Sequence, residues 1–167
     1  MQSQIRVLVV SAMFIALIFV SAYSLSVSNG IGGVIHLGDA LIFLAAAILP
    51  KPHSLVVAAL GLGIFNLASP LGLAMWFPFT ITIKPLMALC FTNKGETVLG
   101  PIRNRIAPFI AMVINTVLYF GANVLITEAG GLAALPGLLI QGAGSVVFFF
   151  VIAFALDVAG VKKLLRL

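Results

Sequence analysis

The chain has 167 residues, of which 62% are hydrophobic and only 8% are charged, and its formal net charge is +5. Because soluble domains carry about 25% charged residues, no soluble fold of this length could hide so much apolar surface. The composition predicts an all-α integral membrane protein embedded in the lipid bilayer. It excludes a nucleic-acid-binding role, although the net charge is basic.

Six apolar segments follow one another along the chain, and each predicts a helix. Their expected bounds are 5–25, 37–49, 53–68, 76–91, 106–126 and 135–159. We therefore interpret residues 1–167 as a single six-helix transmembrane domain. At ~1.5 Å per residue the second segment is about 20 Å long, against a hydrocarbon core of ~30 Å, and the third is also short. Short spans leave a depression that irregular backbone must line, which is tolerated only around a cavity.

The basic residues indicate how the helices are oriented. Three loops that would share one side of the membrane, at 26–36, 69–75 and 127–134, contain no Lys or Arg. Eight of the nine basic residues lie on the other side: Arg6, Lys51, Lys94, Arg103, Arg105, Lys162, Lys163 and Arg166. Because Lys and Arg are enriched in cytoplasmic loops, this pattern predicts six spans with both termini in the cytoplasm.

Lys84 is the ninth basic residue and the only charge in the segment from Trp76 to Phe91. An ammonium group deep in the membrane costs at least a few kcal/mol, so such groups face a protein interior or a watery cavity. Lys84 therefore indicates either a binding cavity or a buried ion pair. Asp39 is the one acidic residue expected in the same half of the membrane.

Polar side chains from five of the predicted helices gather in the outer half of the membrane. Asn115, Tyr119 and Asn123 are spaced i, i+4 and i+8, so they share one helix face, whereas Val146 to Leu156 in the inner half is almost entirely apolar. We expect a polar cavity that is open outward and closed below. Its expected lining is His36, Asp39, Asn66, Trp76, Lys84, Asn115, Tyr119, Asn123 and Gln141.

Several of these residues also have a purely structural interpretation. Lys84 and Asp39 could form a pair that only holds helices together, and Asp39 could instead cap the start of its helix. Asn115 and Asn123 could serve only to join helices.

Three further structural interpretations concern residues near the membrane surfaces. Trp76 is typical of an interfacial aromatic belt, His36 is expected at an exposed loop edge, and Asp157 is expected to be an ordinary surface charge. Ala12 and Ala16, one turn apart in the first helix, either pack internally or let another helix approach closely.

The chemistry that is missing from the sequence also restricts the function. There is no Walker motif for ATP, no His/Glu or Cys cluster for a metal, and no hydrolase or metalloprotease motif. We expect no enzyme activity, no cofactor and no metal site. The sequence indicates a chain that binds a solute but has no energy source of its own to move it.

The segment from Gly32 to Pro50, GGVIHLGDALIFLAAAILP, together with Ala12-xxx-Ala16, the six short helices and the outward cavity, resembles a known family. That family is the substrate-binding S components of energy-coupling factor (ECF) vitamin transporters. The resemblance covers essentially the whole chain. Its most specific part is similar to the subgroup that includes riboflavin-type and hydroxymethylpyrimidine- or pyridoxine-type S components.

The resemblance implies a mechanism and a set of partners. An S component captures a water-soluble vitamin at the outer face and associates with a transmembrane T component and two cytoplasmic ATPases, which make it topple and release the vitamin inside. Ala12 and Ala16 would contact the T component. The loop from Ser26 to His36, with Asn29-Gly30 and Gly32-Gly33, would form a gate over the site. The location implied is the bacterial plasma membrane, as a multi-pass protein.

The identity of the substrate stays open at the level of the sequence. Lys84, the amide side chains and the rings of Tyr119, Trp76 and Phe79 suit a small, polar, aromatic heterocycle. A hydroxymethylpyrimidine or a vitamin B6-like compound fits this set best, and riboflavin is the alternative within the family. An alternative of another class is a membrane scaffold subunit whose polar residues only bind helices together.

Overall fold

The structure, a computed structural model, describes residues 2–28, 34–71, 73–126 and 130–165. The regular structure of the described part is helical apart from one two-stranded antiparallel hairpin, formed by β1 (Val27–Ser28) and β2 (Val34–Ile35). The helical elements are α1 (Gln2–Ser24), α2 (Gly38–Ile48), α3 (Lys51–Ala68), the 3-10 turn η1 (Leu73–Trp76), α4 (Phe77–Leu89), α5 (Ile102–Ile126), α6 (Gly130–Val158) and α7 (Val161–Leu165).

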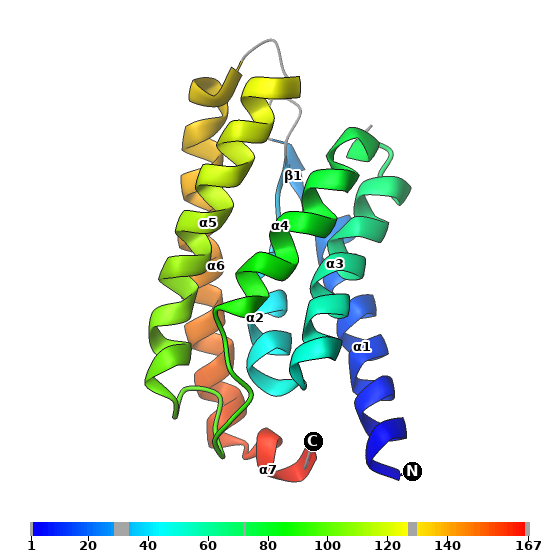
Figure 1. The fold of residues 1–167 in the computed structure, drawn as a ribbon, viewed down its shortest axis with the longest axis vertical. Helices are drawn as coiled ribbons and strands as arrows, with labels where there is room; N and C mark the ends of the chain where they lie inside the picture. Colours follow the sequence, from blue (N-terminus) through cyan, green and yellow to red (C-terminus); the bar gives the residue numbers. More distant parts are fainter. Residues whose placement is uncertain (1, 29–33, 72, 127–129, 166–167) are drawn as a thin grey trace.

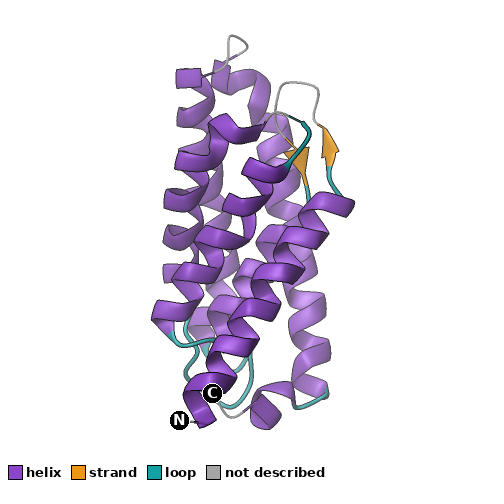
Figure 2. Ribbon diagram, turned by 90° about the vertical axis from the view of Figure 1, so that its right-hand side faces the viewer, coloured by secondary structure: helices purple, strands orange, loops and turns teal. Residues whose placement is uncertain are grey.

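The helices stand side by side in one bundle, as Figures 1 and 2 show. The start of α1 and the end of α7 lie at the same end of the bundle, and Arg6 Nη1 donates a hydrogen bond to the Leu165 carbonyl at 3.2 Å. The β1–β2 hairpin and η1 lie at the opposite end (Figure 1). We call these two parts the termini end and the hairpin end.

Among the described residues, four helices are long and apolar enough to cross a membrane: α1, α3, α5 and α6. Two shorter apolar helical stretches, Gly38–Ile48 and Leu73–Leu89, accompany these four helices. The chain is therefore a helical membrane protein. The third helix was expected to be short, and this was wrong. It begins at Lys51 and has 18 residues, because Pro52 lies in the first turn, where a helix needs no N–H donor.

The short helix α2 is the centre of the bundle. Ten of its 11 residues are buried, and it packs against α1, α3, α4 and α6. Close packing nearby depends on Gly61 of α3, because a Cβ there would lie 2.7 Å from Ile18 Cγ2 of α1. At ~1.5 Å per residue α2 is about 17 Å long, so its start at Gly38 lies within the bundle and other elements complete the hairpin end.

An aromatic cluster fills the bundle below the start of α2. Phe43 lies one turn further along α2 than Asp39, on the same face. Its ring stacks on Phe91 with centroids 5.0 Å apart, and Phe149 of α6 contacts both rings at 6.1 Å and 5.4 Å. All three side chains have exposed fractions of at most 1%. The bundle is thus closed on the side that faces the termini end.

The connection between α4 and α5 is anchored by side chains from its surroundings. Asp157 of α6 accepts hydrogen bonds from the backbone N–H groups of Val98 and Leu99, at 2.5 Å and 2.9 Å. The expectation that Asp157 is an ordinary surface charge was therefore wrong. The two oxygens of its carboxylate accept from two adjacent N–H groups of the folded loop. These N–H groups replace the water that would otherwise solvate the carboxylate.

Asn104 anchors the same connection from α5 and is completely buried. Its side-chain oxygen accepts from the Thr92 N–H at 2.8 Å, and its Nδ2 donates to the carbonyls of Thr92 and Val98, both at 2.8 Å. One side chain thus satisfies three backbone groups in a segment without regular structure.

Replacing Asn104 by Ala is expected to lower the free energy of unfolding by about 2–3 kcal/mol, because it leaves these three backbone groups without partners. Chemical unfolding of the purified protein in detergent, followed by circular dichroism, measures this change. Arg105→Ala is the matched control, since the hydrogen bonds of Arg105 within the described residues go to carbonyls at the exposed surface. An equal loss in both variants would contradict the special role of Asn104.

Candidate functional site

A pocket at the hairpin end of the bundle brings together all nine residues expected to line a cavity. Its empty volume is about 660 Å³, part of which is open to solvent, within the ~300–1,000 Å³ typical of small-molecule sites. The side chains come from α2 to α6, from η1 and from the residue after β2. The lining is His36, Asp39, Leu62, Asn66, Leu73, Trp76, Thr80, Lys84, Asn115, Tyr119, Asn123, Ala134, Gly137, Leu138 and Gln141.

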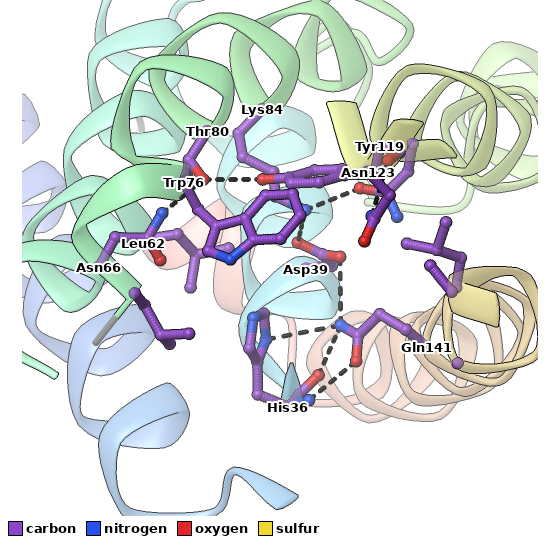
Figure 3. Close-up of a pocket in the computed structure, with 15 residues that line it drawn as sticks. His36, Asp39, Leu62, Asn66, Trp76, Thr80, Lys84, Tyr119, Asn123 and Gln141 are labelled. Atoms are coloured by element: carbon purple, nitrogen blue, oxygen red, sulfur yellow. Dashed lines mark hydrogen bonds and ion pairs between the residues drawn. The ribbon is translucent and has the colours of Figure 1, made fainter. Parts of the chain in front are cut away.

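Lys84 and Asp39 form an ion pair at the floor of this pocket (Figure 3). Lys84 Nζ lies 2.7 Å from Asp39 Oδ1, and the two side chains are 4% and 1% exposed. The interpretation of Lys84 as a member of a buried pair is therefore confirmed. Asp39 does not cap its helix, since α2 has Leu37 at its N-cap and no side-chain capping bond. The carboxylate is drawn to Lys84 instead, because an unpaired buried charge is costly.

The ammonium group of Lys84 has two further neighbours. It donates a hydrogen bond to Asn115 Oδ1 at 2.8 Å, and it lies 4.9 Å from the centroid of the Tyr119 ring. The ring face attracts a cation. Lys84 thus joins α2, α4 and α5, and it orients Asn115 and Tyr119 toward the same space. The stripe of polar residues on α5 faces the pocket.

A chain of hydrogen bonds runs along a second wall of the pocket. Asn66 Nδ2 of α3 donates to Thr80 Oγ1 at 2.6 Å, and Thr80 Oγ1 lies 2.7 Å from Tyr119 Oη (Figure 3). Thr80 was not among the expected lining residues. Its spacing of four from Lys84 on one apolar helix places both side chains on the same face, and this spacing was the available signal.

Trp76 does not lie in an exposed aromatic belt. Its side chain is 7% exposed and its ring centroid lies 6.0 Å from that of Tyr119. Figure 3 shows the indole next to Tyr119 and Lys84, among the residues that line the pocket. The 3-10 turn before α4 places it there, since Leu73 and Trp76 of this turn both line the pocket. Phe79 contacts the Trp76 ring at 6.4 Å but does not line the pocket.

His36 was expected at an exposed loop edge; it lies at such an edge, directly after β2, but its side chain is only partly exposed. Its ring contacts Phe65 of α3 edge to face, with centroids 5.8 Å apart, and its Nδ1 accepts from the Gly38 N–H at 3.2 Å. Burial lowers the pKa of His36 to about 4, opposed by Asp39 and reinforced by Lys84. The imidazole is therefore neutral at pH 7.

Gln141 of α6 contacts both His36 and Asp39. Its Oε1 accepts from the backbone N–H of His36 at 2.8 Å. Its Nε2 donates to the His36 carbonyl at 2.7 Å and to Asp39 Oδ2 at 3.1 Å. Asn123, the ninth expected residue, lies above Asn115 on the stripe of α5, and its Nδ2 donates to the Tyr119 carbonyl at 2.8 Å.

The expected gate, from Ser26 to His36, lies in part outside the described residues, and this part includes Asn29, Gly30, Gly32 and Gly33. Within the described part, β1 and β2 pair in the register Val27 to Ile35 and Ser28 to Val34. Strand β2 also packs against α6. The chain therefore enters the pocket at His36 directly from a paired strand.

Ala12 and Ala16 of α1 are both exposed on the outside of the bundle. The alternative that they pack internally is therefore wrong. Ser11 beside them is buried and donates to the Val7 carbonyl of its own helix at 2.7 Å. No residue of α1 lines the pocket, so the surface of these alanines and the pocket are separate features of the molecule.

The electrostatics of the pocket favour an uncharged ligand. Its formal charges are the carboxylate of Asp39 and the ammonium of Lys84, which cancel, while His36 is neutral and a tyrosine is uncharged at pH 7. Amide, hydroxyl and indole groups supply donors and acceptors around aromatic surfaces. Across the described residues, no group of three or more His, Cys, Asp or Glu side chains is placed to hold a metal ion.

Comparison with known proteins identifies a family. A family model described as "ECF-type riboflavin transporter, S component" matches residues 2–158 of the chain. No curated protein matches the chain, and no solved structure matches it.

Proposed function

The chain belongs to the family of ECF-type riboflavin transporter S components, and on this premise we propose that it captures a small, neutral vitamin or vitamin precursor. The pocket described above is the proposed binding site. One observation carries the proposal: polar and aromatic side chains from five helices converge around a charge-compensated pair, in a pocket that an aromatic cluster closes below.

Our first candidates for the substrate are a hydroxymethylpyrimidine and a vitamin B6-like pyridine. A ring of this size would lie against the indole of Trp76 and the phenol of Tyr119, whose centroids are 6.0 Å apart. Its hydroxyl and ring nitrogen would exchange hydrogen bonds with Lys84, Asn115 and Asn123. Riboflavin is the second candidate, because the description of the matching family names it, and it would fill more of the pocket's empty volume.

The proposal includes an orientation in the membrane. Residues 1–167 form a single six-helix transmembrane domain of the bacterial plasma membrane, with α1 to α6 as spans and both termini cytoplasmic. Four basic side chains at the termini end of the bundle support this orientation: Arg6, Lys51, Arg103 and Lys162. The pocket then opens outward.

The proposal also includes partners. The chain carries no ATPase motif, so an ECF T component and two ATPase subunits would supply the energy and make the bound S component topple and release the vitamin inside. The exposed Ala12 and Ala16 have small side chains, so a helix of the T component could pack closely against α1 there. In this scheme the chain has no catalytic activity of its own.

A thermal-shift screen of the purified protein against riboflavin, pyridoxine and hydroxymethylpyrimidine tests the binding function. A ligand present at 100 times its dissociation constant is expected to stabilise the protein by about 2.7 kcal/mol. The phosphate esters of the same compounds are the matched controls. They should bind at least about tenfold more weakly, because their charge has no uncompensated partner in the pocket.

The alternative of another class is a membrane scaffold subunit. If none of these compounds stabilises the protein, and mass spectrometry finds no small molecule co-purified with it, the binding proposal is wrong and the scaffold is favoured. Stronger binding of the phosphate esters would instead contradict the argument from charge compensation.

A further inference from the structure

Gln141 makes hydrogen bonds that resemble the pairing of one strand with the next. Its side-chain amide accepts from the N–H of His36 at 2.8 Å and donates to the C=O of the same residue at 2.7 Å. His36 directly follows β2. A side chain of α6 therefore pairs with the backbone at the point where the hairpin strand ends (Figure 3).

The same amide reaches the charged floor of the pocket. Gln141 Nε2 also donates to Asp39 Oδ2 at 3.1 Å, while the other oxygen of Asp39 pairs with Lys84 at 2.7 Å. The end of the hairpin, α6, α2 and α4 are thus connected by consecutive polar contacts. The Gln141 side chain is 7% exposed, so water competes little for these bonds.

The hydrogen-bonding capacity of Gln141 is nearly exhausted by these contacts. A primary amide has two N–H donors and one oxygen with two lone pairs. Both donors have close partners, in the His36 carbonyl and Asp39, and the oxygen already accepts one bond. Gln141 therefore has little left to offer a ligand, although it lines the pocket.

We propose that Gln141 is a positioning residue that fastens the end of β2 to the Asp39–Lys84 pair, so that the hairpin and the charged floor of the pocket respond to each other. This inference deepens the proposed function, and its relevance to substrate capture rests on that function. A ligand that withdraws hydrogen bonding from Lys84 or Asp39 shifts the bonds of Gln141, and this shift reaches the strand.

Hydrogen–deuterium exchange at single-residue resolution, on the ligand-free protein in detergent, tests the fastening. In Gln141→Met, which has a similar volume and no amide, the His36 N–H loses its acceptor and should exchange at least about tenfold faster. Gln141→Glu, which lacks the donors and repels Asp39, should show the same direction. Ser145→Ala, one turn further along α6, is the control, since it removes only a bond within the helix.

Unchanged exchange of His36 in Gln141→Met would overturn the proposal, because it would show that Gln141 only fills space. The coupling is tested with the double variant Lys84→Met/Asp39→Asn, since Lys84 makes no hydrogen bond to His36 or Gln141 within the described residues. Removing both charges leaves no unpaired buried charge to lower global stability, and position 39 keeps an oxygen to which Gln141 can donate. Faster exchange at His36, with the buried Val57 of α3 unchanged, supports the coupling. No change at His36, or equal changes at both residues, overturns it. The measurement needs no ligand, so its result is independent of the thermal-shift screen.

Discussion

Replacing Lys84 by Met is expected to lower the free energy of unfolding by about 3–5 kcal/mol, because it leaves the Asp39 carboxylate buried without a counter-charge. Asp39 is 1% exposed, so water cannot take the place of the ammonium group. Its remaining hydrogen-bond donor, Gln141 at 3.1 Å, is neutral. Chemical or thermal unfolding in detergent measures the loss.

The same substitution is expected to abolish vitamin binding. Lys84 orients Asn115 through a 2.8 Å hydrogen bond and lies over the Tyr119 ring at 4.9 Å, so its loss removes the arrangement of the pocket as well as one donor. It also leaves an uncompensated negative charge facing the ligand. Binding is measured with whichever of riboflavin, pyridoxine and hydroxymethylpyrimidine stabilises the unmodified protein.

A double variant separates the structural contribution of Lys84 from its contribution to binding. Combining Lys84→Met with Asp39→Asn removes both charges, so most of the lost stability should return, since buried pairs are often replaceable by neutral groups. Vitamin binding should not return. Recovery of both properties would show that Lys84 serves only to neutralise Asp39, and full stability of the single variant would contradict the burial argument.

The exposed pair of Lys163 and Glu96 provides the matched control. Its atoms lie 3.2 Å apart, but the side chains are 65% and 81% exposed. Ion pairs that remain in water contribute little, so Lys163→Met should leave unfolding nearly unchanged. Both lysines pair with a carboxylate, and the difference in effect that we expect follows mainly from the burial of Lys84.

The polar side of the pocket was largely predictable from the sequence. A charge or amide in a long apolar helix is expensive, so each such residue is conspicuous, and helical spacing then places Asn115, Tyr119 and Asn123 on one face. The alternation of loops with and without basic residues predicted which helix ends lie on the same side of the membrane. All nine residues expected at a cavity line the pocket, and their role as ligand contacts remains a prediction.

The apolar lining could not be predicted in the same way. Leu62, Ala134 and Leu138 are indistinguishable in sequence from residues that face lipid, because the bilayer and the protein interior are equally apolar. Which face of α6 turns inward depends on its packing against α5. That packing is close at Gly142, where a Cβ would lie 2.5 Å from Met112 Cγ, and one glycine among several is no signal for this.

The contacts of polar residues with backbone were also missed. Asp157 and Asn104 bind backbone groups of the α4–α5 connection, and Gln141 binds the backbone of His36. Every residue has such backbone groups, so no sequence pattern identifies which loop will meet which side chain. The consequence was a wrong interpretation of Asp157 and a view of Gln141 as a ligand contact alone.

Replacing Ala16 by Leu is expected to reduce co-purification of the chain with the T component and ATPases by at least about tenfold. Between helices in lipid there is no hydrophobic driving force, so association depends on close packing at small residues. Ala12 and Ala16 are exposed one turn apart on α1. The larger side chain introduced at position 16 would hold the backbone of α1 away from the backbone of a partner helix. Co-expression with the other subunits, followed by affinity purification, measures the complex.

Vitamin binding by the isolated Ala16→Leu variant should equal that of the unmodified protein, because no α1 residue lines the pocket. The control is Ala143→Leu, which makes the same change at an exposed alanine of α6 and should leave the complex intact. Equal losses in the two variants would show that added bulk disturbs the chain wherever it is placed. A complex that tolerates Ala16→Leu would place the partner on another face. The alanine surface and the pocket share no residue. A substitution that disrupts the complex but leaves vitamin binding unchanged would therefore show that assembly and vitamin capture depend on different helices of the bundle.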